Sequence, residues 1–341
     1  MQIAIHHREE SYSIKWIEYC RTNNIPYKLV NCFDNNIIQQ LEGCDGLMWH
    51  WPHWDYKATL FARQLTASLE TIGKKVFPDT KTGWHYDDKL GQKYLLEAID
   101  GHMVPTTVFF HKEEAIRWCN QTAFPKVFKL RGGASSMNVK LVRTRNEAIK
   151  YITKAFKSGF SVENRTAMLA DRLMEYKKYP GVETFKGILK GLLRLFVPTQ
   201  LERASRREKG YIYFQDFIPN NTFDTRVYVI GNYAFGAIRY VRENDFRASG
   251  SHNASSDPAN VDLRCVKLGF EIAEKLQSQC IAYDFIFHNG EPLITEISYA
   301  SSIEVYREFP GYWDKHLNWH NQKFIEENFM IEGFVNSLSQ I

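Results

Sequence analysis

The fold of this chain is decided by the stretch Ala282-Tyr-Asp-Phe-Ile-Phe-His-Asn-Gly-Glu-Pro-Leu-Ile-Thr-Glu-Ile-Ser298. Two apolar runs flank Asn289-Gly290, a dipeptide typical of tight hairpin turns. The sequence therefore predicts two antiparallel strands. Because side chains alternate along a strand, Asp284 and Glu296 are expected to face each other across the hairpin, and Ser298 shares the side of Glu296.

Carboxylates inside otherwise apolar strands are costly unless a cation compensates them. A divalent metal such as Mg²⁺ would do so, because it takes oxygen ligands and commonly bridges to the phosphates of a nucleotide. The alternative is that Asp284 and Glu296 lie on the solvent-exposed face of the hairpin, where charged residues usually are. The hairpin alone leaves both interpretations open.

The composition is that of an ordinary globular protein. The chain has 341 residues, 44% hydrophobic and 24% charged, which is enough for two or three compact units. The net charge of +4 is too mild to indicate a nucleic-acid-binding protein. Six cysteines form no CxxC pair, and the N-terminal residues enter a strand directly, so we expect reduced thiols and a cytoplasmic location. No run approaches the roughly 20 apolar residues of a membrane span.

Strand-like and helix-like runs alternate over about the first 80 residues, which predicts a parallel sheet flanked by helices. The third strand, Gly46 to Trp49, leads into an aromatic loop that ends at Trp54. Ligands collect at the carboxyl ends of such strands, so this loop is either part of a substrate cleft or an aromatic plug over the sheet. The chain has no GxGxxG motif, which argues against a dinucleotide-binding domain.

A glycine loop follows the strand that ends at Lys129, in the order Lys129-Leu-Arg-Gly-Gly-Ala-Ser-Ser-Met137. Its small residues and free amides suit phosphate oxygens, and Lys129 would point at them, but such loops are also ordinary hairpin connections. Residues 160–209 are basic and helical and are interpreted as an insertion. Its segment Gly187 to Val197 is amphipathic, so it packs on its own domain or touches a membrane surface.

Polar residues recur at defined places in the strands beyond residue 210. An apolar strand ends in Gln215-Asp-Phe-Ile-Pro219, which suits an adenine ring through its backbone groups and apolar slot. Asp224 and Arg226 follow in an alternating strand, and Arg239 and Arg247 come later. Arginine is suited to bidentate contact with phosphate or carboxylate, so we expect functional roles for Arg239 and Arg247 and a surface salt bridge for Arg242.

The order of these elements resembles the ATP-grasp superfamily, in the branch of RimK-like carboxylate–amine ligases and glutathione synthetase ATP-binding domains. The resemblance covers about residues 84–300. Asp88-Lys89 ahead of Gly101-His-Met-Val-Pro105-Thr106, Phe124-Pro-Lys-Val-Phe-Lys129 before Gly132-Gly133, and Gln215-Asp-Phe-Ile218 each resemble one of its motifs. The tail around residues 309–319 resembles that of ATP-grasp proteins encoded among bacterial surface-polysaccharide genes.

The resemblance implies an α/β fold, in part α+β, in which two subdomains clasp ATP after an N-terminal preATP-grasp domain. The implied boundaries are 1–84 for the N-terminal domain, 85–210 for the small subdomain with the insertion, and 211–341 for the large subdomain. The implied metal ligands are Asp284, Glu296 and Ser298, with Ser298 in place of the usual Asn, and the implied catalytic residues are Arg239 and Arg247. The implied nucleotide-binding residues are Lys89, Lys129, Gly132, Gly133, Ser135, Ser136, Gln215, Asp216, Phe217, Ile218, Asp224 and Arg226.

The implied function is ATP- and Mg²⁺-dependent ligation, with Mn²⁺ as a possible replacement, of a small-molecule carboxylate to an amine or thiol through an acylphosphate. The alternatives are a nucleotide-binding protein without ligase activity and a kinase that only phosphorylates its substrate. A third is a basic module whose insertion binds an acidic surface. The sequence predicts no nucleic-acid partner and no membrane span, and it leaves the oligomeric state open, with a dimer as the general default.

Overall fold

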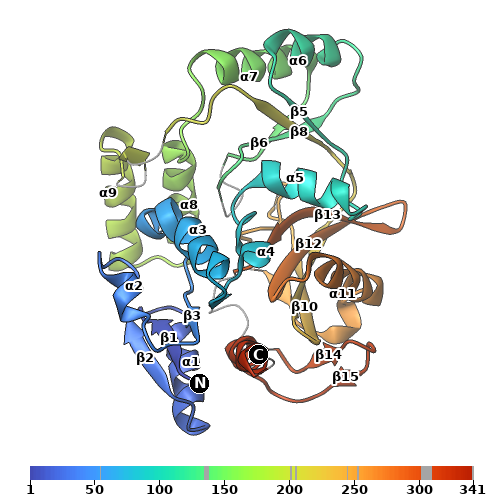
Figure 1. Ribbon diagram of the computed structural model, residues 1–341. Coiled ribbons are helices and arrows are strands. Elements are labelled where there is room, and N and C mark those ends of the chain that lie inside the picture. Colours follow the sequence, from blue (N-terminus) through green and yellow to red (C-terminus); the bar gives the residue numbers. More distant parts are fainter. Residues whose placement is uncertain are drawn as a thin grey trace. The chain divides into compact units, whose positions relative to one another are not determined.

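A computed structural model describes residues 1–53, 55–133, 138–199, 202–203, 206–243, 245–251, 253–300 and 309–339. The chain divides into two compact units (Figure 1). The first comprises Met1–Tyr86, Gly91–Met103 and Ile218–Ile341, and the second comprises Asp87–Leu90 and Val104–Phe217. Helix α5 (Lys89–Ala98) therefore begins in the second unit and continues in the first. Of the helices in the described ranges, none is long and apolar enough to cross a membrane.

The N-terminal part of the first unit is the four-stranded parallel sheet that the sequence predicts. Its strand order is β2-β1-β3-β4, and each neighbouring pair is parallel. Its strands are β1 (Ile3–His6), β2 (Tyr27–Val30), β3 (Gly46–Met48) and β4 (Lys75–Phe77). The accompanying helices are α1 (Ser13–Thr22), α2 (Ile37–Gln40), α3 (Tyr56–Thr71) and α4 (Thr80–Gly83).

The second sheet of the first unit is antiparallel and holds seven strands, in the order β13-β12-β9-β10-β14-β15 with β11 paired to β10. Its strands are β9 (Phe223–Ile230), β10 (Tyr233–Tyr240), β11 (Ala254–Ser255), β12 (Cys280–His288), β13 (Glu291–Ser298), β14 (Tyr312–Asp314) and β15 (Trp319–His320). The β12–β13 pair is the expected hairpin, with its turn at Asn289-Gly290. Helix α11 (Leu263–Leu276), preceded by the turn η1 (Pro258–Asn260), covers one face through Val227, Tyr283 and Phe285.

The other face of this sheet shares one core with the parallel sheet. Phe235, Ala237 and Ala282 belong to the same buried cluster as Ile3 and Met48. Helix α12 (Glu326–Leu338) closes this core. A Cβ built on Gly46 of β3 would lie 2.6 Å from Cζ of Phe334 in α12, so only glycine lets this helix approach so closely.

The second unit is built on a four-stranded antiparallel sheet with the order β5-β8-β6-β7. Its strands are β5 (Thr106–Phe109), β6 (Lys126–Lys129), β7 (Lys140–Val142) and β8 (Ile212–Asp216). Figure 1 shows α6 (Lys112–Cys119) and α7 (Arg145–Lys157) on one side of it, where they bury Phe128 and Phe214. The predicted insertion forms a helical hairpin, α8 (Arg165–Lys178) and α9 (Val182–Phe196).

Candidate functional site

A β-bulge in the β12–β13 hairpin decides which way its carboxylates point. Asp284 is the cross-strand partner of Glu296, whereas the next residue, Phe285, pairs with Ile294, so Thr295 is the extra residue. Ile294 and Ile297 can therefore both face the core under α11, which strict alternation forbids. As a result Glu296 and Ser298 lie on the opposite face, together with Asp284.

Four charged side chains from three adjacent strands meet on that face. Arg226 donates to Asp284 through Nε (2.5 Å to Oδ1) and Nη2 (2.8 Å to Oδ2). Arg239 donates to Asp224 through Nε (2.7 Å) and Nη2 (2.5 Å), and its Nη2 also lies 3.0 Å from Oδ2 of Asp284. We call these four residues the ion cluster. Its two carboxylates, both buried, balance two half-buried guanidinium groups, which makes the burial of these charges tolerable.

The two carboxyls of the ion cluster titrate differently. Burial tends to raise the pKa of Asp284, but Arg226 and Arg239 outweigh it and hold that pKa well below its usual range. Burial raises the pKa of Asp224, which has Arg239 as its main partner and Asp284 as a like-charged neighbour. Burial also disfavours the charge on Arg239, yet Asp284 and Asp224 keep the pKa of this guanidinium above its ordinary value. Asp284 is therefore held as a carboxylate.

The residues of this face fit a hard divalent cation. Each oxygen of a carboxylate can accept more than one bond, and Oδ1 of Asp284 takes only one from Arg226, so a metal could share it. Ser298 donates its hydroxyl to the carbonyl of Ala300 (2.7 Å) and accepts from the N–H of Ala300 (3.3 Å), which leaves one lone pair of its oxygen for a metal. The described residues contain no group of three or more His, Cys, Asp or Glu side chains that could hold a metal. A cation here would thus depend on two carboxylates with hydroxyl, water or phosphate oxygens, as Mg²⁺ does.

In the second unit, two of the predicted nucleotide-binding residues, Lys129 and Gln215, lie on the sheet face opposite α6 and α7. In the β6–β8 register Val127 pairs with Gln215 and Lys129 pairs with Tyr213, while Phe128 and Phe214 face the helices. Lys129 and Gln215 thus share one face, and both are buried. Gln215 donates to the hydroxyl of Thr106 on β5 (3.2 Å), so that face carries a lysine and a fixed amide.

The glycine loop is fixed to the segment before α5. Lys89 donates through Nζ to the carbonyl of Gly133 (2.9 Å) and through its backbone N–H to the carbonyl of Arg131 (2.8 Å). Asp87 accepts from the N–H of Gly133 (2.7 Å), and a Cβ on Gly132 would lie 3.2 Å from its other oxygen. The structure thus brings Lys89, Gly132 and Gly133 together. Ser135 and Ser136 lie outside the described residues.

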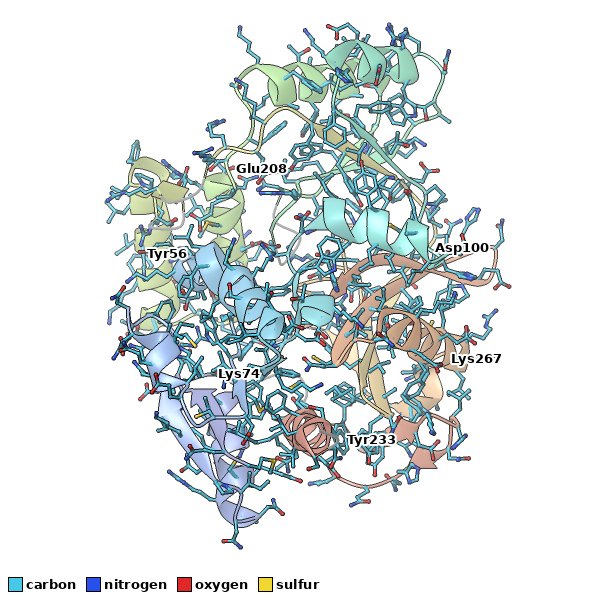
Figure 2. The ribbon with its side chains drawn as sticks, viewed as in Figure 1. Tyr56, Lys74, Asp100, Glu208, Tyr233 and Lys267 are labelled. Atoms are coloured by element: carbon cyan, nitrogen blue, oxygen red, sulfur yellow. The ribbon has the colours of Figure 1, made fainter. Side chains whose placement is uncertain are left out.

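A second set of bonds holds the start of the same loop. The backbone N–H of Arg131 donates to the hydroxyl of Tyr211 (2.7 Å), which in turn donates to Glu208 (2.8 Å), labelled in Figure 2. Sequence reasoning missed Asp87 and Tyr211. The only signal for Asp87 was its place beside Asp88-Lys89, and Tyr211 is 80 residues from the loop that it supports.

The remaining predicted residues of the adenine linker are arranged differently. Asp216 accepts from Lys126 (2.6 Å) on the helix-covered side of the sheet, away from Lys129 and Gln215, and its backbone N–H donates to Pro105. Phe217 and Ile218 are half-buried where the chain passes from the second unit to the first. Any contact of Asp216 with an adenine ring would therefore involve its backbone carbonyl rather than its side chain.

Arg247 is not part of the ion cluster. It pairs with Asp245 two residues earlier, through Nε at 3.0 and 2.8 Å from the two carboxylate oxygens. Burial tends to raise the pKa of Asp245, but Arg247 lowers it below its usual value. Arg242 donates through Nη2 to the carbonyl of Ser249 (2.8 Å), in the loop that follows Arg247. His252, in the same loop, lies outside the described residues.

The aromatic loop after β3 is largely core. Trp49 and Trp51 are each 1% exposed. The backbone of Trp51 is bonded twice to the hydroxyl of Tyr299, through its N–H (3.1 Å) and its carbonyl (2.8 Å). Since Tyr299 directly follows Ser298, this loop is anchored to the end of the strand that carries Glu296.

A buried histidine and an arginine lie near this anchor. His50 accepts at Nδ1 from the N–H of Tyr12 (3.4 Å), so its proton is on Nε2. Burial and the charge of Arg8 lower the pKa of His50 to about 3. Nε2 is buried and has no hydrogen-bond partner among the described residues. Arg8 itself lies 3.6 Å from Asp55.

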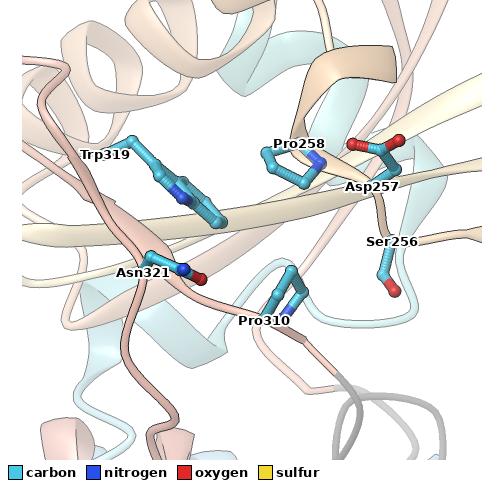
Figure 3. A pocket seen from close by; sticks show the side chains of 6 residues that line it. All are labelled: Ser256, Asp257, Pro258, Pro310, Trp319 and Asn321. Carbon is cyan, nitrogen blue, oxygen red and sulfur yellow. The ribbon is translucent and has the colours of Figure 1, made fainter.

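Elsewhere in the first unit, an open cavity of about 630 Å³ is lined by Trp319, Asn321, Pro310, Ser256, Asp257 and Pro258 (Figure 3). It contains neither a member of the ion cluster nor a predicted nucleotide-binding residue. It is therefore distinct from the site described above.

The comparisons with known proteins agree with this geometry. Residues 199–309 match the model of the RimK-like ATP-grasp domain. Over that segment the chain is similar to RimK-like ATP-grasp domains. The matched segment includes the ion cluster, Gln215, Glu296 and Ser298. No curated protein sequence gives a significant match.

Several solved ATP-grasp structures share the fold over the length of the chain. The D-cycloserine synthetase DcsG has a TM-score of 0.59 at 12% identity, with 99% of this chain and 100% of that chain covered. A D-alanine–D-alanine ligase from Bacillus anthracis, complexed with ATP, has a TM-score of 0.57 at 10% identity, covering 100% and 97%. A RimK domain ATP-grasp protein from Sphaerobacter thermophilus has a TM-score of 0.52 at 15% identity, covering 98% and 100%. The expected fold class and family resemblance are confirmed.

Asp284→Asn is expected to lower the free energy of unfolding at pH 7 by about 3–5 kcal/mol, because two half-buried guanidinium groups are then left with a single carboxylate to neutralise them. Since the folded pKa of Asp284 is below its ordinary value of 3.8, its contribution is complete above that value and is lost as the pH falls below it. The difference from wild type should therefore shrink below about pH 4 in urea unfolding followed from pH 7 to pH 2. Asp216→Asn, whose side chain is 41% exposed beside Lys126, is the control and should cost about 1 kcal/mol or less. Equal losses in the two variants would contradict the role given to the ion cluster.

Proposed function

We propose that this protein is an ADP-forming ligase that joins a small-molecule carboxylate to an amine through an acylphosphate. The observation that carries the proposal is the sheet face on which Asp284, Glu296 and Ser298 lie beside the arginines of the ion cluster. Such a face suits a reaction in which negative charge on phosphate oxygens must be held and neutralised. The Mg²⁺ that Asp284 and Glu296 would hold supplies charge neutralisation at the phosphates when bound.

In the first step of the proposed reaction, an oxygen of the acid attacks the γ-phosphorus of ATP, and the bond to the β-phosphate oxygen breaks to leave ADP. In the second step, the amine attacks the carbonyl carbon of the acylphosphate. Phosphate leaves with the bonding electrons, and the amine loses a proton. No protein nucleophile is needed. Catalysis would therefore depend on how the protein binds the substrates and where it positions its charged groups.

Each predicted residue has a task in this scheme. Lys89 and Lys129 would bind phosphate oxygens, with the glycine loop held closed against them by Asp87. Gln215 and the backbone of Phe217 and Ile218 would bind adenine. Arg239 would stabilise the transferring phosphoryl group and hold Asp284 in place, and Arg247 would do the same for the acylphosphate from the loop beyond β10. Asp224 and Arg226 would act by positioning these groups.

The acid is proposed to bind at the carboxyl ends of β1 and β3. The strand order β2-β1-β3-β4 reverses between these two strands, and ligands of open parallel sheets bind at such a reversal. Arg8 follows β1 and His50 follows β3, and they offer a guanidinium and a buried Nε2–H. Both are donors, which suits the oxygens of a carboxylate or of another anionic group of the substrate.

The first test is ADP release by the purified protein with Mg²⁺ and ATP against a mixed panel of carboxylates and amines. The ligase proposal expects turnover that requires an acid and an amine together. Glu296→Ala should abolish it, whereas Glu291→Ala, on the same strand but with a 75% exposed side chain, should not. Turnover with the acid alone, leaving a stable phosphorylated product, would instead identify a kinase. Tight ATP binding with no turnover would identify a non-catalytic nucleotide-binding protein.

Lys129→Met should weaken ATP use by roughly 10- to 100-fold in kcat/KM, the size expected for one lost charge-assisted hydrogen bond. Lys126→Met is the matched control, because it removes a lysine from the same strand but from the opposite sheet face, where Lys126 pairs with Asp216. Steady-state kinetics with varied ATP distinguishes the two variants. If they are impaired alike, Lys129 does not bind the phosphates.

Arg8→Gln should raise the KM for the acid by roughly 10- to 100-fold and leave the KM for ATP near its wild-type value. Arg21→Gln, an arginine of α1 whose recorded bond is to Tyr27, is the control. The measurement is steady-state kinetics with each substrate varied in turn. An unchanged KM for the acid, with the variant folded, would place the acid elsewhere.

A further inference from the structure

Helix α9 presents its apolar side to solvent. Val182, Phe185, Leu189, Leu192 and Phe196 recur at intervals of three and four residues, so they form one stripe along the helix. Their exposed fractions, in that order, are 71%, 49%, 52%, 45% and 83%, and Leu193 beside them is 62% exposed. We call these six residues the apolar stripe. Helices of globular proteins ordinarily bury such a stripe, whereas α9 exposes it to solvent.

The opposite side of α9 explains this orientation. A Cβ added to the buried Gly191 would lie 2.9 Å from Leu169 of α8, so the two helices approach closely at this glycine. Arg172 of α8 donates to the carbonyl of Gly187 (2.7 Å), and Arg165 donates to the carbonyl of Leu195 (3.0 Å). The side of α9 that carries Gly191 is therefore the side that packs on α8, and Ile188 and Leu195, which lie toward it, are half-buried. The apolar stripe remains for another surface.

The charge of the hairpin indicates what that surface is. Residues 160–209 contain eleven Lys and Arg and six Asp and Glu, a net charge of +5, whereas the whole chain has a net charge of +4. Lys186 and Lys190 are exposed and lie along one edge of the apolar stripe, and Glu183 is the one acidic residue of the helix. An apolar stripe bordered by lysines matches a bilayer surface with anionic headgroups.

We propose that α9 binds the surface of an anionic phospholipid bilayer, with the apolar stripe at the boundary between headgroups and acyl chains. A helix of 15 residues is about 22 Å long, short of the roughly 30 Å hydrocarbon core, so α9 lies in the surface and does not span it. This proposal uses residues of the second unit that take no part in the proposed reaction. It therefore stands independently of the ligase proposal.

The test is co-sedimentation of the full-length protein with vesicles of phosphatidylcholine alone and of phosphatidylcholine mixed with phosphatidylserine. Binding is expected with the mixed vesicles, to be at least about tenfold weaker with phosphatidylcholine alone, and to weaken as salt rises. Leu189→Ser with Leu193→Ser should abolish it, and Lys186→Gln with Lys190→Gln should reduce it by about tenfold or more. Leu60→Ser is the control, because Leu60 is 75% exposed on α3 of the first unit.

Several outcomes would overturn the proposal. Wild-type protein that stays in the supernatant with both vesicle types would do so, and this outcome does not depend on whether any variant folds. Equal binding to both vesicle types would exclude the anionic surface. Self-association in sedimentation velocity without vesicles, lost in the variant with both leucines replaced, would show that a second copy of the chain covers the stripe. Circular dichroism and ATP turnover of each variant, both expected to match wild type, separate loss of binding from loss of folding.

Discussion

The ion cluster of Asp224, Arg226, Arg239 and Asp284 is the interaction on which the first unit's functional face depends. Two carboxylates and two guanidinium groups neutralise each other, and that balance allows four charges to lie among buried aromatic and aliphatic side chains. The same contacts hold Asp284 ionised and fix its orientation. Stability and the proposed metal binding would thus depend on one set of hydrogen bonds, so a change of Asp284 for one purpose would affect the other.

The bulge at Thr295 adds a second constraint on that face. A regular strand would have required a choice between burying Ile294 and placing Glu296 on the face of Asp284, because Ile294 and Glu296 would then lie on the same side. One extra residue removes the conflict, because it reverses the alternation between the two isoleucines. In the second unit, Asp87 and Tyr211 similarly fix the backbone of the glycine loop, because each accepts a hydrogen bond from one of its N–H groups. In both units the residues that would touch a ligand are positioned by residues that would not.

Much of the fold was predictable because it rests on local patterns. Alternating runs predicted the parallel sheet, Asn289-Gly290 predicted the hairpin turn, and the motif around Lys129 predicted a strand followed by a loop. Which carboxylate each arginine would contact was not predictable. Strand pairing placed Arg239 opposite Asp224 and within the ion cluster, whereas Arg247, in the loop beyond β10, paired with Asp245 two residues earlier. Asp216 was likewise drawn to Lys126 on the far side of its sheet.

The sequence by itself determined the element types, the order of the motifs and the hairpin with its turn at Asn289-Gly290, since these follow from side-chain periodicity and turn chemistry over a few residues. Only the tertiary structure decided that Asp284 would share its oxygens with two arginines, that a bulge would pair Glu296 with Asp284 and turn it to the same face, and that α9 would bury Gly191 and expose the apolar stripe. Those outcomes depend on distances between residues far apart in the chain. A pattern of local preferences does not contain these distances.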